Sequence, residues 1–565
     1  MLAGTAILGT AAIPWLIGRA IDDIDAHDKS GLETLCAALI LAGLVRLVFS
    51  VVRRIVSGNV SLAVEYDMRN GLYAHLQALE LGFFDRQQTG QLMSRATVDL
   101  QSIRFFLGYG FVWIAQSALT ILFAAVAMFA LDPGLAAMSL VPVPFVVVVA
   151  FRYGRRSRPA IQEVQQRIGE LTAEAEENVS GVRVVKSFAA EPRQLERFRR
   201  QVGRVFEQAM YSTRLSAFYQ PFIGFLPQLG LAAILAVGGR AVINGTLTTG
   251  GFTAFYTYLL MLIGPMRSLG IALGFGQRAT ASGVRLFEIL DRTPRLASPP
   301  DAPPLPEGNG QVELRHVSFA YEDGPPVLRD IDLVVDGGTT VALVGATGSG
   351  KSSLVSLLGR NYDVTGGSVL VDGADVRDVE LNSLRSQIGV VTDDPFLFSA
   401  SVHDNIAYGR PDATREEVER AAERAQAASF IAELPEGYDT VVGERGLTLS
   451  GGQRQRIAIA RALVIDPRVL VLDDATSSVD ATTEQAIKEA LREAMRGRTT
   501  FVIAHRLSTI ALADDIVVLE NGDIAARGTH DELLRESELY AEIAAKGLPD
   551  QVFLNRDPVE KVAGL

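Results

Sequence analysis

One stretch of the sequence has the residue types and spacing that bind phosphate groups. It follows the apolar run TVALV, precedes the helical run SSLVSLLG and fits the pattern GxxxxGK[ST]. In that context glycines let backbone N–H groups close on phosphate oxygens, the lysine neutralises the β- and γ-phosphates, and the hydroxyl binds Mg²⁺. We therefore predict a nucleotide-binding loop at Gly345, Ala346, Thr347, Gly348, Ser349, Gly350, Lys351 and Ser352, with Ser353 beside it.

Two carboxylates end an apolar strand further along the chain. Residues 469–474 read VLVLDD, and a buried strand of this kind places Asp473 against Mg²⁺ and Asp474 against the attacking water. An apolar strand followed by a capping aspartate is common by itself. The phosphate-binding loop in the same chain is what favours the catalytic interpretation.

A third group of residues lies at the start of a predicted helix. Ser450, Gly451, Gly452 and Gln453 follow Leu449 and precede RQRIAIARAL. The first backbone N–H groups of a helix have no intrahelical partner, so together with the serine hydroxyl they can face an anion. The alternative is an ordinary helix cap with no ligand.

Six apolar windows precede residue 280. A helix needs about 20 apolar residues to cross a bilayer. The windows lie at 2–21, 33–52, 108–131, 134–151, 217–239 and 252–275. The two long connections between them are rich in arginine and the short ones are not, and arginine-rich connections stay in the cytoplasm. The pattern predicts a multi-pass protein with both termini cytoplasmic.

The long connections and the proline-rich segment define the domains. The long connections have apolar residues at helical spacing, which favours helical extensions of the spans over a solvated charged linker. Residues 291–310 are dense in proline and form a boundary. We predict an all-α polytopic membrane domain with long cytoplasmic extensions at 1–290, an α/β P-loop nucleotide-binding domain at 311–547 and a tail at 548–565.

Composition excludes several other classes of protein. Apolar residues make up 48% of the chain, which is consistent with membrane spans in one half. The net charge of −12 argues against nucleic acid as a partner, because nucleic-acid binders usually present a basic face. Cys36 is the single cysteine, so neither an internal disulfide nor a cysteine-based zinc site can form.

The residues LSGGQ at 449–453 are the signature of ATP-binding-cassette proteins. With the membrane half, the chain resembles an exporter of this family that has six spans followed by its ATPase domain. The resemblance extends to GFFDRQQTGQLMSRATVDL at 82–100 and ENVSGVRVVKSFAAE at 177–191, which look like the family's intracellular loops. GERG at 443–446 resembles the segment that touches such loops.

The resemblance implies roles for further residues. Two ATPase domains would meet head to tail, so that each ATP lies between the phosphate-binding loop of one and the LSGGQ of the other. Tyr321 is placed where the family stacks an aromatic ring on adenine, and His505 where it has a histidine near the γ-phosphate. Residues 477–480 would join the two sites. A surface aromatic residue and a helix cap are the alternative readings of Tyr321 and His505.

Two residues depart from the family pattern. Asp474 replaces the usual glutamate after the Mg²⁺ aspartate, and Asp393 replaces the usual glutamine before DPFLF. Asp393 can still bind Mg²⁺ but adds negative charge near phosphate. Since LSGGQ is intact, these departures predict a heterodimer in which this chain has the slow ATP site. A homodimer with two slow sites is the alternative.

The start of the chain also differs, because only a dozen or so residues precede PWLIGRAIDD. Either further residues precede Met1 or the first span is short.

These observations predict ATP-driven export across the plasma (inner) membrane. The predicted cofactors are ATP and Mg²⁺, and the predicted partners are a second half-transporter, the lipid bilayer and a small hydrophobic or amphipathic substrate. The spans contain few charges besides Arg19, Arg46 and Arg267, so no site for a charged substrate is evident. A lipid flippase is the main alternative. A soluble ATPase of the DNA-repair kind has no spans, so the six apolar windows exclude that class. Importers usually keep the membrane domain and the ATPase domain on separate chains, so the fusion of the two favours an exporter by analogy.

Overall fold

The computed structural model describes residues 2–322, 324–446, 448–473, 481–504 and 507–546. They form two compact units. The first is helical and takes in the chain up to Gln77 and Thr89–Arg292. The second is the predicted α/β domain and takes in Ala78–Gln88 and the chain from Thr293 onward. The short segment Ala78–Gln88 thus belongs to the second unit, although the predicted membrane domain flanks it on both sides.

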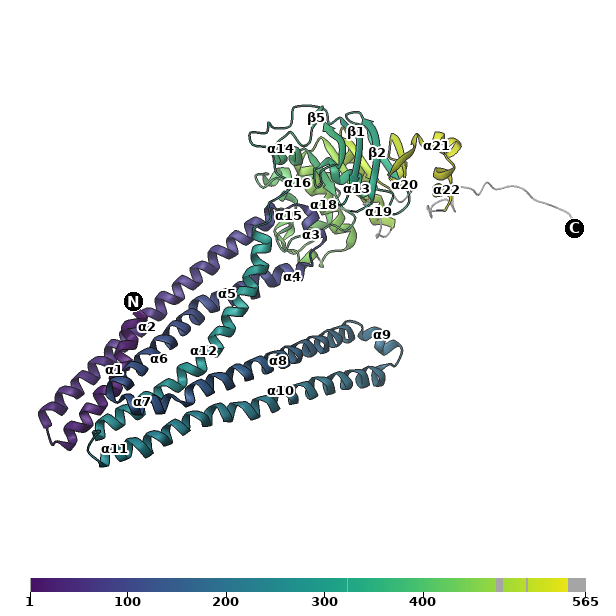
Figure 1. Ribbon diagram of the computed structural model, residues 1–565. Helices are drawn as coiled ribbons and strands as arrows, with labels where there is room; N and C mark the ends of the chain where they lie inside the picture. The colour runs from purple at the N-terminus through teal and green to yellow at the C-terminus, as the bar shows by residue number, and fades with distance from the viewer. Residues whose placement is uncertain (1, 323, 447, 474–480, 505–506, 547–565) are drawn as a thin grey trace. The chain divides into compact units, whose positions relative to one another are not determined.

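The first unit consists of long helices joined by short turns (Figure 1). Three π-helical turns interrupt them, and α4 to α6 run on as one helix from Thr89 to Leu131. The elements are α1 (Leu2–Asp25), α2 (Lys29–Ala78), α4 (Thr89–Ser94), η1 (Arg95–Asp99), α5 (Leu100–Phe105), η2 (Phe106–Gly110), α6 (Phe111–Leu131), α7 (Pro133–Leu140), α8 (Pro142–Ser180), α9 (Val182–Ser187), α10 (Glu191–Ala233), η3 (Ile234–Gly238), α11 (Gly239–Ile243) and α12 (Thr249–Leu290).

Four helices in the described part of the chain are long and apolar enough to cross a membrane. They are Lys29–Ala78, Thr89–Leu131, Pro133–Ser180 and Glu191–Ile243. The predicted windows at 2–21 and 252–275 are helical in α1 and α12, but each includes side chains outside the described ones. The count of six spans therefore stays a prediction. The helical extension of the long connections is confirmed, because α2, α8 and α10 continue well past their apolar windows.

Two features hold the helices of the first unit together. Phe255, Tyr258 and Leu259 of α12 are buried in one apolar cluster with Met128 of α6 and Ile234 of η3. At the short turns, polar caps fix the direction of the chain. Asp132, for example, accepts a hydrogen bond from the backbone N–H of Leu135 (2.9 Å) and so begins α7.

α8 and α10 lie side by side, and α9 closes the turn between them (Figure 1). Several apolar side chains at this turn are exposed, next to the exposed charged residues Arg183 and Lys186. Phe188 is 79% exposed and Val184 is 62% exposed, and Val179 and Val182 are exposed as well. This apolar turn has no covering element in the described part of the chain.

The second unit contains two sheets. A four-stranded sheet has the order β2-β1-β4-β5 and a six-stranded sheet has the order β10-β9-β3-β8-β7-β6. The strands are β1 (Val312–Ala320), β2 (Pro326–Val335), β3 (Thr340–Val344), β4 (Gly366–Val371), β5 (Ala374–Asp375), β6 (Ile388–Val391), β7 (Val469–Asp473), β8 (Thr499–Ile503), β9 (Asp515–Glu520) and β10 (Asp523–Gly528).

Helices surround the two sheets, and short ones connect the strands (Figure 1). They are α3 (Leu81–Asp85), α13 (Lys351–Leu358), α14 (Leu381–Ser386), α15 (Val402–Ala407), α16 (Arg415–Arg424), α17 (Ala428–Ala432), η4 (Gly437–Asp439), η5 (Glu444–Gly446), α18 (Gly451–Ile465), α19 (Ala481–Met495), α20 (Leu507–Ile510), α21 (His530–Glu536) and α22 (Glu538–Lys546). The predicted fold class, a helical membrane domain followed by an α/β domain, is confirmed.

The central strands of the larger sheet are parallel and in register. Leu343 of β3 pairs with Ile503 of β8, and Ile503 pairs with Asp473 of β7. Leu472 of β7 in turn pairs with Val391 of β6. The carboxyl ends of these four strands therefore meet at one edge, where ligands bind in open α/β sheets.

Candidate functional site

The phosphate-binding loop leaves the sheet at the carboxyl end of β3, as predicted. Its glycines at 345, 348 and 350 all have positive φ, from +84° to +156°. A methyl group at Gly345 would lie 2.2 Å from the backbone oxygen of Leu519, and one at Gly350 would lie 2.6 Å from Leu328 Cδ2. Glycine is therefore required here for both the backbone angle and the close packing.

The polar groups of this loop are arranged for an anionic ligand. Lys351 is buried, and its Nζ donates to the backbone oxygens of Gly345 (2.8 Å) and Ala346 (3.0 Å). Burial lowers the pKa of Lys351, and the charge of Asp473 opposes this shift. The buried Ser349 hydroxyl has no hydrogen-bond partner. A triphosphate would supply an acceptor for this hydroxyl and a counter-charge for the buried ammonium.

The three oxygen-bearing side chains predicted to bind Mg²⁺ lie near the carboxyl ends of β3, β7 and β6. Ser352 is exposed at the start of α13, Asp473 ends β7 and is half-buried, and Asp393 is exposed two residues after the end of β6. Hydroxyl and carboxylate oxygens are the donors that Mg²⁺ prefers. The three side chains share one edge of the sheet, and their oxygen donors are of the type that fits the predicted ion. Asp474, His505 and residues 477–480 lie outside the described residues.

Tyr321, the residue predicted to stack on adenine, lies beside the phosphate-binding loop. It follows β1, and its hydroxyl is hydrogen-bonded to the Ser353 hydroxyl (2.9 Å). Its ring packs edge to face against Phe319 and Tyr362, with centroid distances of 4.7 and 5.2 Å. The side chain remains 41% exposed, so part of the ring is open to a ligand.

The signature residues begin α18 as predicted, and the structure shows how they cap it. The Ser450 hydroxyl accepts from the backbone N–H of Gln453 (3.3 Å), and Gln453 Oε1 accepts from the backbone N–H of Ser450 (2.8 Å). These reciprocal bonds form a capping box. The predicted contact of Ser450, Gly451, Gly452 and Gln453 with an ATP held by the partner's phosphate-binding loop stays a prediction.

One aromatic residue at the site was not predicted from the sequence. Tyr362 follows α13 in the run GRNYD and contacts both Phe319 and Tyr321. No motif in the sequence points to Tyr362, because the residues that it contacts belong to β1 and to the distant segment Ala78–Gln88.

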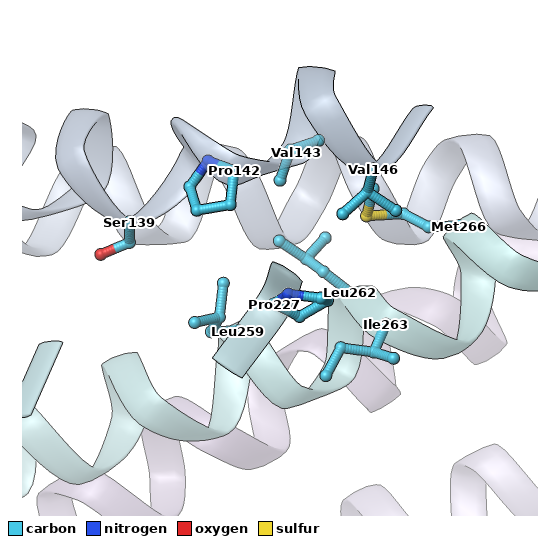
Figure 2. Close-up of a pocket in the computed structure, with 9 residues that line it drawn as sticks. All are labelled: Ser139, Pro142, Val143, Val146, Pro227, Leu259, Leu262, Ile263 and Met266. Carbon is cyan, nitrogen blue, oxygen red and sulfur yellow. The ribbon is translucent and has the colours of Figure 1, made fainter. Parts of the chain in front are cut away.

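The helical unit contains a small apolar pocket between α7, α8, α10 and α12 (Figure 2). Ser139 provides its one polar side chain, and no charged residue lines it. The other residues are Pro142, Val143, Val146, Pro227, Leu259, Leu262, Ile263 and Met266.

The fold and the site together define a P-loop ATPase joined to a bundle of apolar helices, and comparison with known proteins places it in a family. Residues 2–266 match the family described as ABC transporter transmembrane region, and residues 328–477 match the family described as ABC transporter. The chain belongs to the ABC transporter family.

Similar proteins agree with this assignment. The chain is 41% identical to an ATP-dependent lipid A-core flippase of Syntrophus aciditrophicus, over 94% of this chain and 88% of that protein. It is 39% identical to a multidrug efflux ATP-binding/permease protein of Mycobacterium tuberculosis, over 100% of this chain but 47% of that protein. A solved structure of a bacterial Atm1-family ABC exporter with ATP bound superposes with a TM-score of 0.78, at 32% identity and 96% coverage of both chains.

The general function follows from membership of this family. The protein is a multi-pass membrane protein that binds ATP and couples its hydrolysis to export. In the described structure, the phosphate-binding loop, Asp473 and Asp393 lie at the carboxyl ends of β3, β7 and β6 in the larger sheet. Tyr321 follows β1 of the smaller sheet and reaches Ser353 beside the loop.

Proposed function

We propose that this chain is the half of a heterodimeric exporter whose own ATP site is slow. The observation behind the proposal is Asp474, which follows Asp473 where hydrolytic members of the family usually have glutamate. Its carboxylate is shorter by one methylene. A general base must reach its water within hydrogen-bond distance, and general acid–base catalysis typically contributes about 10² to 10⁴ in rate. This site should bind ATP and hydrolyse it slowly.

Asp393 supports the same reading from a second loop. It lies just beyond β6, at the sheet edge that also holds Asp473. A neutral glutamine would orient water without adding charge, whereas a carboxylate adds negative charge near the triphosphate. When bound, Mg²⁺ neutralises part of the phosphate charge. We assign its protein ligands as Ser352, Asp473 and Asp393.

The intact signature points to a partner with a complementary defect. In the family, LSGGQ completes the site formed by the phosphate-binding loop of the other half. Ser450, Gly451, Gly452 and Gln453 would thus serve a competent site whose catalytic glutamate belongs to the partner. That partner should also have an altered LSGGQ, since its signature serves the slow site.

Two observations favour a second half of some kind. The apolar turn at α9, with Phe188 79% exposed, is the kind of patch that marks a protein interface. The mycobacterial relative is about twice as long as this chain, which spans 47% of it. A homodimer with two slow sites is the alternative to the heterodimer.

The cargo is proposed to be hydrophobic or amphipathic. The spans contain few charged residues besides Arg19, Arg46 and Arg267, so the sequence offers no site for a charged cargo. A lipid flippase is the second candidate, favoured by the 41% identity to a lipid A-core flippase.

We place the protein in the plasma (inner) membrane with six spans and both termini in the cytoplasm. ATP binding would close the two ATPase domains and turn the spans outward. Hydrolysis, mainly at the partner's site, would reset them.

The ATPase activity of the purified chain in lipid nanodiscs tests the slow site. Wild type, Asp474→Glu/Asp393→Gln and the inactive control Lys351→Ala are compared at saturating Mg·ATP. We expect wild type to hydrolyse ATP only slightly faster than Lys351→Ala and the double variant to gain at least about tenfold. The oligomeric state of each sample is measured alongside.

Brisk turnover by wild-type dimers, equal to that of the double variant, would show that Asp474 is an adequate base and would overturn the heterodimer proposal. A chain that stays monomeric would exclude the homodimer alternative. In that case the two substitutions are tested again in the co-purified complex.

A further inference from the structure

The segment Ala78–Gln88 packs on the ATPase domain at one side of the predicted adenine site. Tyr362 donates a hydrogen bond from its hydroxyl to Asp85 Oδ2 (2.5 Å). A methyl group added at Gly82 would lie 3.5 Å from Tyr362 Cε1, so the backbone of the segment passes next to the same ring. The segment thus meets Tyr362 with both a hydrogen bond and a close backbone contact.

Tyr362 in turn contacts the residue predicted to hold adenine. Its ring is nearly perpendicular to that of Tyr321, at 87° and a centroid distance of 5.2 Å, an arrangement that favours one orientation of the pair. Tyr321 is also fixed at its far end by the hydrogen bond to Ser353. A continuous set of contacts therefore runs from Asp85 through Tyr362 and Tyr321 to α13.

The segment also holds the residue that follows Tyr321. Arg86 pairs with the carboxylate of Glu322, and Arg295 of the linker pairs with the same carboxylate (3.4 Å). Ala78–Gln88 therefore contacts the Tyr321 region at two points, through Tyr362 and through Glu322.

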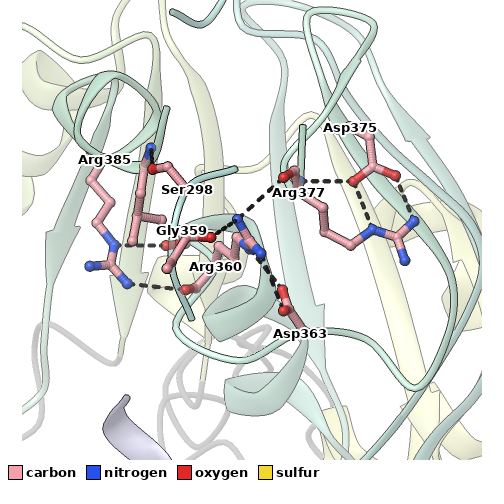
Figure 3. Close-up of polar contacts among 9 residues, drawn as sticks. Ser298, Gly359, Arg360, Asp363, Asp375, Arg377 and Arg385 are labelled. Atoms are coloured by element: carbon pink, nitrogen blue, oxygen red, sulfur yellow. Dashed lines mark hydrogen bonds and ion pairs between the residues drawn. The ribbon is translucent and has the colours of Figure 1, made fainter. Parts of the chain in front are cut away.

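The turn that bears Tyr362 is braced from both sides (Figure 3). Arg360 is buried and pairs with Asp363 (2.8 Å), and Arg385 donates to the backbone oxygens of Gly359 (3.1 Å) and Arg360 (3.0 Å). Because these bonds hold the backbone of the turn in place, a shift of the Tyr362 ring moves its neighbours Tyr321 and Asp85 more readily than it moves the backbone.

We propose that Tyr362 is a positioning residue that couples adenine stacking on Tyr321 to the docking of the segment Ala78–Gln88. The inference rests on the proposed role of Tyr321. It adds a residue that orients Tyr321. By linkage, if docking orients Tyr321 for adenine, then bound adenine strengthens docking by the same factor.

The hydroxyl of Tyr362 stays protonated and can therefore donate its hydrogen bond to Asp85. Burial, and next the hydrogen bond and the charge of Asp85, raise the pKa of Tyr362 well above its usual value. The phenol keeps its proton throughout the physiological pH range, so the contact with Asp85 is a constant feature of the docked segment.

The protein in nanodiscs tests the coupling with Tyr362→Phe, Asp85→Ala and the double variant. Affinities for Mg·ATP and for Mg·tripolyphosphate, which has no base, are measured by competition with a fluorescent ATP analogue. Tyr540→Phe is the matched control, because it removes a tyrosine hydroxyl bonded to His530 elsewhere in the ATPase domain (2.7 Å).

We expect each single substitution to weaken Mg·ATP binding about fivefold, the equivalent of one hydrogen bond, and to leave Mg·tripolyphosphate binding unchanged. The double variant should be no weaker than either single one, because both remove the same contact. Additive effects, or equal losses for tripolyphosphate, would overturn the proposal.

Hydrogen exchange of residues 78–88 gives a second readout. Mg·ATP should slow exchange there in wild type and Tyr540→Phe, and should have no such effect in Tyr362→Phe. Protection that persists in Tyr362→Phe would contradict the coupling. Unchanged ATP affinity in Tyr321→Ala would instead contradict the proposed role of Tyr321 in adenine binding. Neither binding result depends on which half of the dimer hydrolyses ATP.

Discussion

Gly18 of α1 and Gly250 of α12 bring two backbones into direct contact. A methyl group at Gly250 would lie 1.8 Å from the backbone oxygen of Gly18. Next to this contact, Asp22 accepts hydrogen bonds from the Thr248 hydroxyl (2.9 Å) and from the backbone N–H of Gly250 (2.8 Å). Because Gly18 and Gly250 have no side chains, the two backbones can touch, and the Asp22 carboxylate then holds α1 against the start of α12.

Gly250→Ala should therefore destabilise the protein. The new methyl group meets backbone, which cannot rotate away, and overpacking of this kind costs about 1 to 3 kcal/mol or more. The thermal midpoint of the purified protein in one detergent checks this. Gly71→Ala is the control, because nothing lies within 4 Å of that position in α2, and it should leave the midpoint unchanged or raise it slightly. Equal midpoints for both variants would contradict the packing argument.

Gly350→Ala should abolish tight ATP binding. Gly350 has φ +105° and its added methyl group would lie 2.6 Å from Leu328 Cδ2, so the loop must shift. We expect at least about a tenfold loss of Mg·ATP affinity, in keeping with a strain of 1 to 3 kcal/mol. Gly359→Ala, at the other end of α13, has open space and negative φ and should bind ATP as wild type does. Equal affinity of both variants would contradict the predicted loop geometry.

Asp99→Ala should cost more stability than the loss of an exposed ion pair. Asp99 is buried and accepts from the Ser282 hydroxyl (2.8 Å) and from Nε of Arg285 (3.0 Å). Removing it leaves these donors without their carboxylate, at a cost of about 1 to 3 kcal/mol. Glu191→Ala breaks the exposed pair with Lys186, and such pairs are worth about 1 kcal/mol or less. A smaller fall in thermal midpoint for Asp99→Ala than for Glu191→Ala would contradict this ranking.

His316 should titrate above its usual pKa of 6.5. The hydrogen bond to Asp330, and next the charges of Asp332 and Asp330, raise the pKa of His316. The interaction of protonated His316 with the two aspartates adds to the folding stability of the protein. This contribution is fully present below about pH 6.5 and is lost as the pH rises through the pKa of His316 in the folded protein. Asp330→Asn should move the NMR titration of His316 toward 6.5, with His316→Gln used to assign the signal. A titration midpoint that does not move would show that Asp330 is not the cause.

Much of this protein followed from local patterns in the sequence. The glycine spacing at 345–350, the apolar strand before Asp473 and the serine and glycines before α18 are each encoded within a few neighbouring residues. Chain stereochemistry and helix capping act over that range, so the sequence was sufficient for the phosphate-binding loop, the capped signature helix and the two-part fold. The apolar windows were equally local, because a bilayer selects continuous apolar stretches.

The tertiary structure decided the contacts between residues that are far apart in the chain. Asp85 meets Tyr362, Gly18 meets Gly250, and residues 78–88 join the ATPase domain rather than the helices that flank them. None of these pairs has a periodic signal, since each depends on how whole elements pack and on which side chain is small or polar at the point of contact. Packing is specified by the complementarity of distant surfaces, and that information is absent from any short window of sequence.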